Sequence, residues 1–542
     1  MGKKFYCVFT NACLLLIGAG ILSRFLLLGN GYEYDELYTA ITANPNLSLG
    51  YIWDNYLMVD VHPPLYNIVL WIYNHFVPYG PELWMRLPSV IFGILGMILA
   101  WVLFPKRYSK LARLIFMAFL SCNFWFVLYA QHARAYSMLF CIAVPFNYLF
   151  INMAFWVRKG KQIGWKHWAW YGVLGVLLCW THYFGAMAFG FFSLALLGYA
   201  FRYKRNLWPF ILVPAVVTLL FLPWAVPNLL YNAGDNKFNG NWWAKGYPMV
   251  AAWWHIIEFY FINQRVFLVV SLLFSMCLWK RVQLHKKGKP NPYIRDIALF
   301  SWVGLSMMGF VFLISLKMFV FFGRYFMAIV PGLLTAFSLC IAPCVRKERG
   351  FAWWTLLALV CFIGFGIHTS HYTTSRLYAG AKAAMEFYRD YAPEKELFVA
   401  PIEGFPPNTT RDMYAFYPKY VLKMDKEVTA LTRLPKKELN EALARKENAL
   451  IWMPHCNPYK LRMLAIKWDR TVGIEGYLGT SCFIRFGEEG EVEPPAEWKK
   501  VHRERFELER NEDGSYRFPE GWKEMEIRLF KEKEAGIEFF SF

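Results

Sequence analysis

Long apolar stretches alternate with short basic loops over the first 370 residues of the chain. A membrane-spanning helix needs about 17–25 mostly apolar residues, and the pattern predicts about eleven such spans. We place them at 6–28, 86–104, 111–130, 136–156, 167–183, 184–201, 207–230, 265–279, 297–316, 325–344 and 351–369. The first stretch is too long for the apolar part of a signal peptide, so we interpret it as a retained span.

The basic loops set the predicted topology. Lys and Arg cluster at 106–110, 158–166, 202–205, 280–289 and 346–349, and such loops face the cytoplasm. Only one crossing is then possible between residues 35 and 106, so the stretch 64–78, which begins at a double proline, is predicted to lie in the interface. Residues 253–261 are predicted to form a second interfacial helix. The amino terminus is inside and the carboxyl terminus outside.

Residues 371–542 have a different pattern and are predicted to form a soluble extracytoplasmic α/β domain. Charge becomes dense, and helix-like runs (381–391, 436–446) alternate with strand-like runs (397–400, 449–453, 482–486). No phosphate-binding loop, serine elbow or metal cluster is visible, so the domain either recognises the acceptor or acts as a structural cap. Cys456 and Cys482 either pair or remain free thiols.

Composition supports the membrane class. The chain of 542 residues is 57% hydrophobic and only 18% charged, which is more apolar surface than a soluble domain buries. Its net charge of +19 comes from basic loops that suit anionic lipid headgroups, so we expect membrane lipids and no nucleic acid as partners. The expected location is the inner or plasma membrane, with many passes.

Charged and polar side chains gather at the predicted external ends of the spans. Adjacent carboxylates at the mouth of a span are costly unless a ligand or a chemical step uses them. Together with several cations, they suggest an anionic ligand at the outer membrane surface. Alternatively, single basic residues at span ends only reach to the interface. The set comprises Asp35, Glu36, His62, Arg86, Gln131, His132, Arg134, Tyr136, His182, Tyr183, Lys317, Arg324 and Tyr325.

Two kinds of chemistry follow from these residue types. A partly shielded carboxylate, Asp35 or its neighbour Glu36, can act as a general base on a hydroxyl or amine. The alternative is that Asp35 caps a helix beginning at Glu36. Arg86 and Arg324 offer forked donors suited to phosphate oxygens, and Lys317 and His62 offer further positive charge. This arrangement requires neither a metal nor another cofactor.

Six motifs in order resemble those of the GT-C superfamily of membrane glycosyltransferases. They are YEYDELYT, HPPLY, RLPS, YAQHARAYS, WTHYFG and GRYFMAIVP, all within residues 1–370. The most similar branch contains the protein O-mannosyltransferases and the bacterial aminoarabinose transferase for lipid A. The resemblance implies a GT-C-like membrane domain (1–370). It also implies transfer of a sugar, with inversion, from a polyprenyl (undecaprenyl) monophosphate carrier to an external lipid, glycan or protein acceptor.

The resemblance also implies roles for individual residues. Asp35 matches the catalytic acid of the first external loop, Arg86 the arginine of the RLPS motif, and Arg324 with Tyr325 the late Arg-Tyr pair near the carrier phosphate. His62 stands where a Lys or His precedes the paired prolines. Together with Lys317, whose charge suits an anion, these residues are expected to bind the donor phosphate. Residues of the central motifs are expected to bind substrate: Gln131, His132, Arg134, Tyr136, His182 and Tyr183.

The chain departs from the family pattern at two positions. His132 stands where relatives often have Glu, which removes a carboxylate. Ala328 stands where a proline is common, with Pro331 following later.

Other functions fit parts of the pattern. A transporter or flippase of a lipid-linked sugar would share the spans and cations, although transporters often have polar residues near the middle of the membrane. A structural subunit would leave the carboxylates and arginines unexplained.

Overall fold

The computed structural model describes residues 3–26, 28–234, 249–288, 291–377, 380–391, 393–394, 396–400, 407–424, 428–430, 449–453, 472–478, 481–486, 509–510, 516–517 and 527–529. It divides into two compact units. The membrane unit comprises Met1–Leu28, Thr42–Pro78 and Leu83–His371, and the carboxyl-terminal unit comprises Gly29–Ile41, Tyr79–Glu82 and Tyr372–Phe542. The sequence-based division at residue 370 assigns the two short segments, 29–41 and 79–82, to the membrane domain, whereas the structure groups them with the carboxyl-terminal unit.

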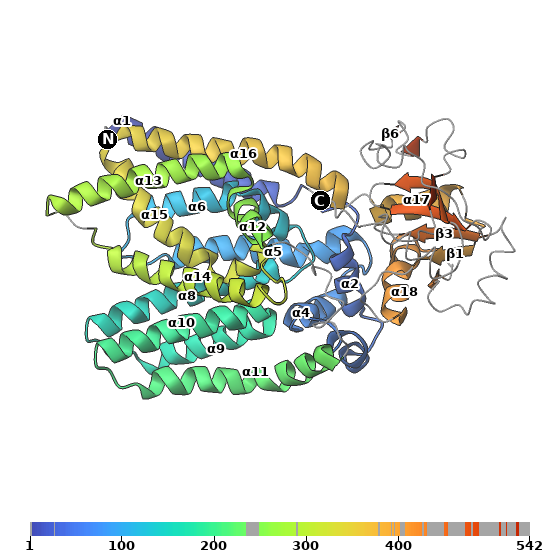
Figure 1. Ribbon diagram of the computed structural model, residues 1–542, viewed down its shortest axis with the longest axis horizontal. Coiled ribbons are helices and arrows are strands. Elements are labelled where there is room, and N and C mark those ends of the chain that lie inside the picture. Colours follow the sequence, from blue (N-terminus) through green and yellow to red (C-terminus); the bar gives the residue numbers. More distant parts are fainter. Residues whose placement is uncertain are drawn as a thin grey trace. The chain divides into compact units, whose positions relative to one another are not determined.

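Long helices that run alongside one another build the membrane unit (Figure 1). Within the described residues, nine helices are long and apolar enough to cross a membrane, or ten if one bent pair of helices counts as a single span. The one remaining predicted span, 167–183, corresponds to α9, a helix of 17 residues. The helices that correspond to the predicted spans are α1 (Lys3–Ser23), α5 (Glu82–Leu103), α6 (Lys110–Cys122) with α7 (Phe124–Ala130), α8 (Tyr136–Arg158), α9 (Trp165–Thr181), α10 (Tyr183–Arg202), α11 (Trp208–Gly234), α13 (Gln264–Lys286), α14 (Ile294–Ser315), α15 (Val330–Lys347) and α16 (Arg349–Leu377).

Short helices lie where the sequence predicts segments that do not span. Helix α4 (Leu65–Asn74) has 10 residues and begins directly after the double proline, whose rings suit the start of a helix rather than its interior. Helix α12 (Val250–Phe261) has 12 residues. Both are too short to cross a bilayer. Two shorter pieces, α3 (Leu49–Ile52) and η1 (Trp53–Leu57), precede α4.

The predicted span 111–130 is not one straight helix, because α6 and α7 meet at an angle of 69°. Asn123 lies at the break, and its side-chain oxygen accepts a hydrogen bond from the Trp125 N–H at 2.9 Å, which caps α7. Its amide nitrogen donates to the carbonyls of Phe259 and Tyr260 at 3.2 and 3.0 Å. The break therefore ties this helix pair to α12.

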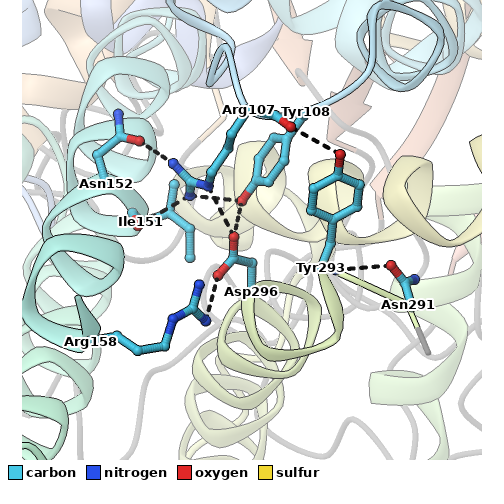
Figure 2. Close-up of polar contacts among 8 residues, drawn as sticks. All are labelled: Arg107, Tyr108, Ile151, Asn152, Arg158, Asn291, Tyr293 and Asp296. Carbon is cyan, nitrogen blue, oxygen red and sulfur yellow. Dashed lines mark hydrogen bonds and ion pairs between the residues drawn. The ribbon is translucent and has the colours of Figure 1, made fainter. Parts of the chain in front are cut away.

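A buried carboxylate joins three helices at the end of the membrane unit that holds the basic loops (Figure 2). Asp296, on α14, lies 3.2 Å from Arg107 Nε and 3.4 Å from Arg158 Nη1, and it accepts a hydrogen bond from the Tyr108 hydroxyl at 2.8 Å. Arg107 also donates to the side chain of Asn152 and to the carbonyl of Ile151. The ends of α5, α8 and α14 are thus held by one charged cluster.

The carboxyl-terminal unit contains a mixed sheet. Its described strands are β1 (Glu396–Val399), β2 (Val428–Ala430), β3 (Ala449–Met453), β4 (Val472–Leu478), β5 (Ser481–Phe486) and β8 (Ile527–Leu529), in the order β2-β1-β3-β5-β4-β8. Strand β1 is parallel to β2 and β3, and the remaining pairs are antiparallel. Strands β6 (Glu509–Arg510) and β7 (Tyr516–Arg517) form a separate pair.

The helices of this unit are α2 (Tyr34–Thr42, which ends in the membrane unit), α17 (Gly380–Tyr391), α18 (Pro407–Phe416) and η3 (Tyr417–Val421). The strands predicted at 397–400, 449–453 and 482–486 correspond to β1, β3 and β5, and the helix predicted at 381–391 corresponds to α17. The helix predicted at 436–446 and Cys456 lie outside the described residues.

Candidate functional site

The ring of His182 lies at the meeting point of four chain segments in the membrane unit. Its centroid is 5.4 Å from that of His62, 5.9 Å from Tyr136 and 5.2 Å from Tyr325. Tyr136 begins α8 and His62 precedes α4, whereas Tyr325 comes from the segment before α15. The structure therefore brings together residues from four of the six sequence motifs.

The local backbone explains why a histidine occupies this position. His182 is extended (φ −162°, ψ 141°) between α9 and α10, and its Nδ1 accepts a hydrogen bond from the Phe184 N–H at 3.1 Å. Burial, together with the positive charges of His62, Arg134 and Arg324, holds the pKa of His182 well below its ordinary value. The neutral ring then carries its proton on Nε2. No described residue accepts from this buried nitrogen, so it is available to an oxygen of a ligand.

Arg324 and Tyr325 lie on a 3-10 segment, η2 (Gly323–Ile329), rather than on an α-helix. Helix α15 starts directly afterwards, with Pro331 in its first turn, so the replacement of the common proline by Ala328 leaves a regular helix start. The half-buried Arg324 guanidinium lies 5.5 Å from the ring centroids of both Phe322 and Tyr325. These contacts orient the guanidinium through cation–π attraction.

The segment η2 packs closely against α12 because residue 323 is a glycine. A Cβ atom at Gly323 would lie 2.3 Å from Phe259 Cβ and 2.5 Å from the carbonyl oxygen of His255. Any larger residue must therefore displace η2, and with it the side chains of Arg324 and Tyr325.

We expect Gly323→Ala to lower the free energy of unfolding by about 1–3 kcal/mol, because overpacking costs that much in a close-packed interior. Thermal unfolding in detergent measures the effect. Gly309→Ala in α14 is the matched control, since a Cβ there meets no atom within 4 Å. It should be neutral or stabilise by up to about 1 kcal/mol. Equal stability of the two variants would show that η2 tolerates the shift.

Sequence reasoning missed two residues of α12, His255 and Glu258. Burial, followed by the charge of Arg324, lowers the pKa of His255 to about 4. Burial raises the pKa of Glu258, and Arg324 opposes that shift. Because His255 is neutral near pH 7, its 3.8 Å approach to Glu258 is a polar contact rather than an ion pair. The sequence signal that could have indicated this site is Glu258, an acid within an otherwise aromatic and apolar helix.

Asp60 was also missed, although it stands two residues before His62. Its carboxylate oxygen lies 3.1 Å from His62 Nδ1 and accepts the Val61 N–H at 2.6 Å. Asn228 and Asn232, from α11, donate to its carbonyl at 2.7 and 3.3 Å. The second carboxylate oxygen is buried without a hydrogen-bond partner among the described residues. Asp60 thus orients the His62 ring and leaves one acceptor for a ligand.

Several predicted site residues make contacts that stabilise the membrane unit. Arg86 is fully buried and donates to the carbonyl of Leu28 at 3.1 Å. Gln131 donates to the carbonyl of Ser23. The two contacts tie their motifs to the last residue of α1 and to the segment that follows it. They favour a structural contribution of Arg86 and Gln131 in addition to any role in binding.

The remaining predicted residues differ in their distance from His182. Arg134 is buried and acts electrostatically on it. Tyr183 donates to the side chain of Asn228 at 2.7 Å, and the His132 ring lies 6.0 Å from that of Tyr129. Lys317 is exposed just beyond α14, and within the described residues no contact joins it to His182 or its neighbours.

Asp35 and Glu36 belong to the carboxyl-terminal unit. Helix α2 begins at Tyr34, so both acids lie in its first turn, and the alternative in which Asp35 caps a helix starting at Glu36 is wrong. Instead, the fully buried Glu36 accepts the Glu33 N–H at 3.0 Å. This is the reciprocal half of a capping box, in which an acid in the first turn satisfies a backbone donor before the helix. Asp35 is half-buried.

Taken together, the described helices define the class of this chain, a polytopic helical membrane protein, as the sequence predicts. Among solved structures, the chain is similar to ArnT from Cupriavidus metallidurans bound to undecaprenyl phosphate, with a TM-score of 0.52 and 12% identity over 87% of this chain and 97% of that one. The same protein in the apo state gives a TM-score of 0.49 at 12% identity with the same coverage. No family model and no curated protein matches the chain. The likeness confirms the predicted polytopic all-α fold of the membrane unit, whereas the extracytoplasmic location of the carboxyl-terminal domain stays a prediction.

Proposed function

We propose that this protein is a glycosyltransferase that moves a sugar from a polyprenyl monophosphate, such as undecaprenyl phosphate, to a lipid, glycan or protein acceptor. The convergence of His62, Arg134, His182, Arg324 and Tyr325 carries the proposal. Such a set of positive and hydrogen-donating groups suits the phosphate of a lipid carrier. The solved ArnT structure of the same fold is bound to undecaprenyl phosphate, which supports this carrier.

The proposed reaction is a single displacement. The acceptor oxygen or nitrogen attacks the anomeric carbon while Asp35 takes its proton, and the bond from that carbon to the phosphate oxygen breaks. The phosphate leaves with the electron pair, and the configuration at carbon inverts. Negative charge grows on the phosphate in the transition state, so nearby cations such as Arg324 lower the barrier.

The two ends of the membrane unit suggest which side holds the site. Helix α8 starts at Tyr136, beside His182, and ends at Arg158, beside Asp296. The basic loops therefore lie at the end of the bundle opposite His182. By the positive-inside rule, that end faces the cytoplasm, which supports a site on the extracytoplasmic side of the cell membrane. The proposal keeps the extracytoplasmic location that the sequence predicts for the carboxyl-terminal unit.

Labelled donors test the function. Membranes containing the protein are supplied with undecaprenyl phosphate carrying isotopically labelled mannose, glucose or 4-amino-arabinose. If the protein transfers a sugar, one of these labels should move to an acceptor. Mass spectrometry should then detect one undecaprenyl monophosphate for each sugar transferred. Membranes containing Asp35→Asn serve as the control. Label that crosses the membrane still attached to its carrier would overturn the proposal in favour of a transporter.

Arg324 is the residue that we expect to bind the donor phosphate. A charge-assisted hydrogen bond contributes about 1.5–3 kcal/mol, so Arg324→Ala should weaken binding of undecaprenyl phosphate by roughly 10–100-fold. Arg324→Lys should recover only part of the loss, because an ammonium cannot pair two phosphate oxygens in the same plane. Affinity is measured with labelled undecaprenyl phosphate on the purified protein.

The exposed Lys317 offers the matched control for this measurement. Lys317→Ala removes one positive charge close in sequence to Arg324 but away from the described contacts of His182. It should leave the affinity within about twofold. A loss in Lys317→Ala without one in Arg324→Ala would move the phosphate site toward Lys317.

A further inference from the structure

The carboxyl-terminal unit contains two short segments that lie on either side of residues 42–78 in the sequence. Gly29–Ile41 carries Asp35, and Tyr79–Glu82 leads into α5. Within this unit, both segments contact the same short piece of chain, the end of α18 and the following turn η3. We call Phe416, Tyr417 and Tyr420 of this piece the aromatic clamp.

Ring contacts connect the clamp with both segments. The ring of Tyr32 lies 5.6 Å from those of Phe416 and Tyr417. The ring of Tyr79 lies 5.5 Å from Phe416 and 4.9 Å from Tyr420. Tyr32, Phe416 and Tyr417 are at most 2% exposed, so the contact is a packed core rather than a surface encounter. Three of these four ring pairs meet edge-on, an arrangement that aromatic rings prefer.

Polar contacts reinforce the rings. The Tyr417 hydroxyl accepts the Tyr32 N–H and donates to Glu82 at 3.3 Å, so one group joins the two segments. Lys382, from α17, pairs with Glu82 at 3.1 Å and donates to the Gly29 carbonyl at 3.0 Å.

The two segments are also bonded directly to each other. The Tyr32 hydroxyl donates to the Gly80 carbonyl at 2.6 Å, and the Tyr79 hydroxyl donates to the Ala40 carbonyl at 2.9 Å. Contacts therefore hold α2 at both ends: Tyr32 stands two residues before its first residue, and Ala40 lies in its last turn.

Gly80 allows this close approach. Its φ of +120° is a conformation that residues with a side chain rarely adopt, and a Cβ there would lie 2.4 Å from the Tyr420 carbonyl oxygen. The backbone of 79–82 can meet η3 only with glycine at this position.

We infer that the aromatic clamp positions Asp35, so that the carboxyl-terminal unit holds the proposed base of the reaction in place. Asp35 lies in the first turn of α2, three residues after Tyr32, and the clamp fixes where that helix begins. The inference rests on the proposed function, because a base must stay within hydrogen-bond reach of its proton. A displacement of about 1 Å can cost 10²-fold in rate. Tyr417 and Gly80 are then positioning residues, which act through Asp35.

Hydrogen exchange on the full-length protein tests the clamp without reference to activity. Tyr417→Phe removes the hydroxyl that joins the two segments, so the amides of 29–41 should exchange roughly tenfold faster, as expected for the loss of about 1.4 kcal/mol. Gly80→Ala should have the same or a larger effect. Trp452→Phe is the control, because Trp452 is a fully buried strand residue that packs against Tyr414 in the same unit. If the amides of 29–41 exchange at the parent rate in both Tyr417→Phe and Gly80→Ala, the inference is overturned.

Kinetics separate positioning from general stability. Using whichever labelled undecaprenyl phosphate sugar the parent transfers, kcat should fall at least tenfold in Tyr417→Phe, while KM for the donor stays within about twofold. Trp452→Phe should leave both constants near those of the parent. Faster exchange with an unchanged kcat would overturn the positioning role. If the unmodified protein transfers no sugar, the proposed function is overturned instead. The exchange experiment would still decide whether the aromatic clamp holds residues 29–41.

Discussion

Replacing Asp35 with Asn should lower the rate of sugar transfer by roughly 10²–10⁴-fold, the usual contribution of a general base. The substitution keeps the size of the side chain but removes its basicity. Binding of undecaprenyl phosphate should remain close to that of the parent, because a loss in kcat without a loss in donor affinity marks a group that acts in the transition state. Single-turnover transfer and equilibrium binding measure the two quantities separately.

Glu36→Gln provides the matched control beside it. The Glu36 carboxylate accepts the Glu33 N–H, and a glutamine oxygen can accept the same bond, so α2 should keep its cap. Transfer should then stay within a few fold of the parent. If Asp35→Asn transfers at a normal rate and Glu36→Gln does not, the base is Glu36.

Replacing Asp296 with Ala should lower the free energy of unfolding of the membrane unit by about 3–5 kcal/mol. The carboxylate is 8% exposed and lies against two partly buried arginines, so its removal leaves both positive charges without their partner. The apparent melting temperature in detergent should fall, whereas the affinity of the folded protein for undecaprenyl phosphate should not change. Residues at the opposite end of α8 make the contacts with His182.

An exposed ion pair at the same end of the bundle serves as the comparison. Glu348 lies 2.5 Å from Lys280, with side chains 44% and 37% exposed, so solvent screens the pair. Glu348→Ala should cost less than about 1 kcal/mol. Equal losses in the two variants would show that the Asp296 cluster is no more than a surface ion pair.

The membrane architecture could be predicted from the sequence because its signal is local. A bilayer sets the length of a span, so apolar run length separates α5 and α8 from the short α4 and α12 without knowledge of their neighbours. The order of six motifs indicated the fold in the same way. Strand β3 was evident as an apolar run between polar segments.

Other features depend on contacts between residues far apart in the chain. The 69° bend at Asn123 reflects hydrogen bonds to α12, more than 130 residues later, and no local pattern reports them. The sequence did not show which of the two adjacent acids has a structural role, and only the backbone showed that Glu36 accepts the Glu33 N–H. Asp60 and Glu258 became candidate site residues only because the structure places Asp60 beside His62 and Glu258 near Arg324.

The sequence by itself determined that this chain is a helical membrane protein with a charged, aromatic set of residues at its span ends. Hydrophobic length and residue type suffice for that, because burial in a bilayer is a property of each segment alone. Only the tertiary structure decided that His62, Tyr136 and Tyr325 meet around the ring of His182, and that Phe416 and Tyr417 pack on the segment with Asp35. These contacts arise from the packing of distant segments, whose energies depend on shape and distance rather than on composition.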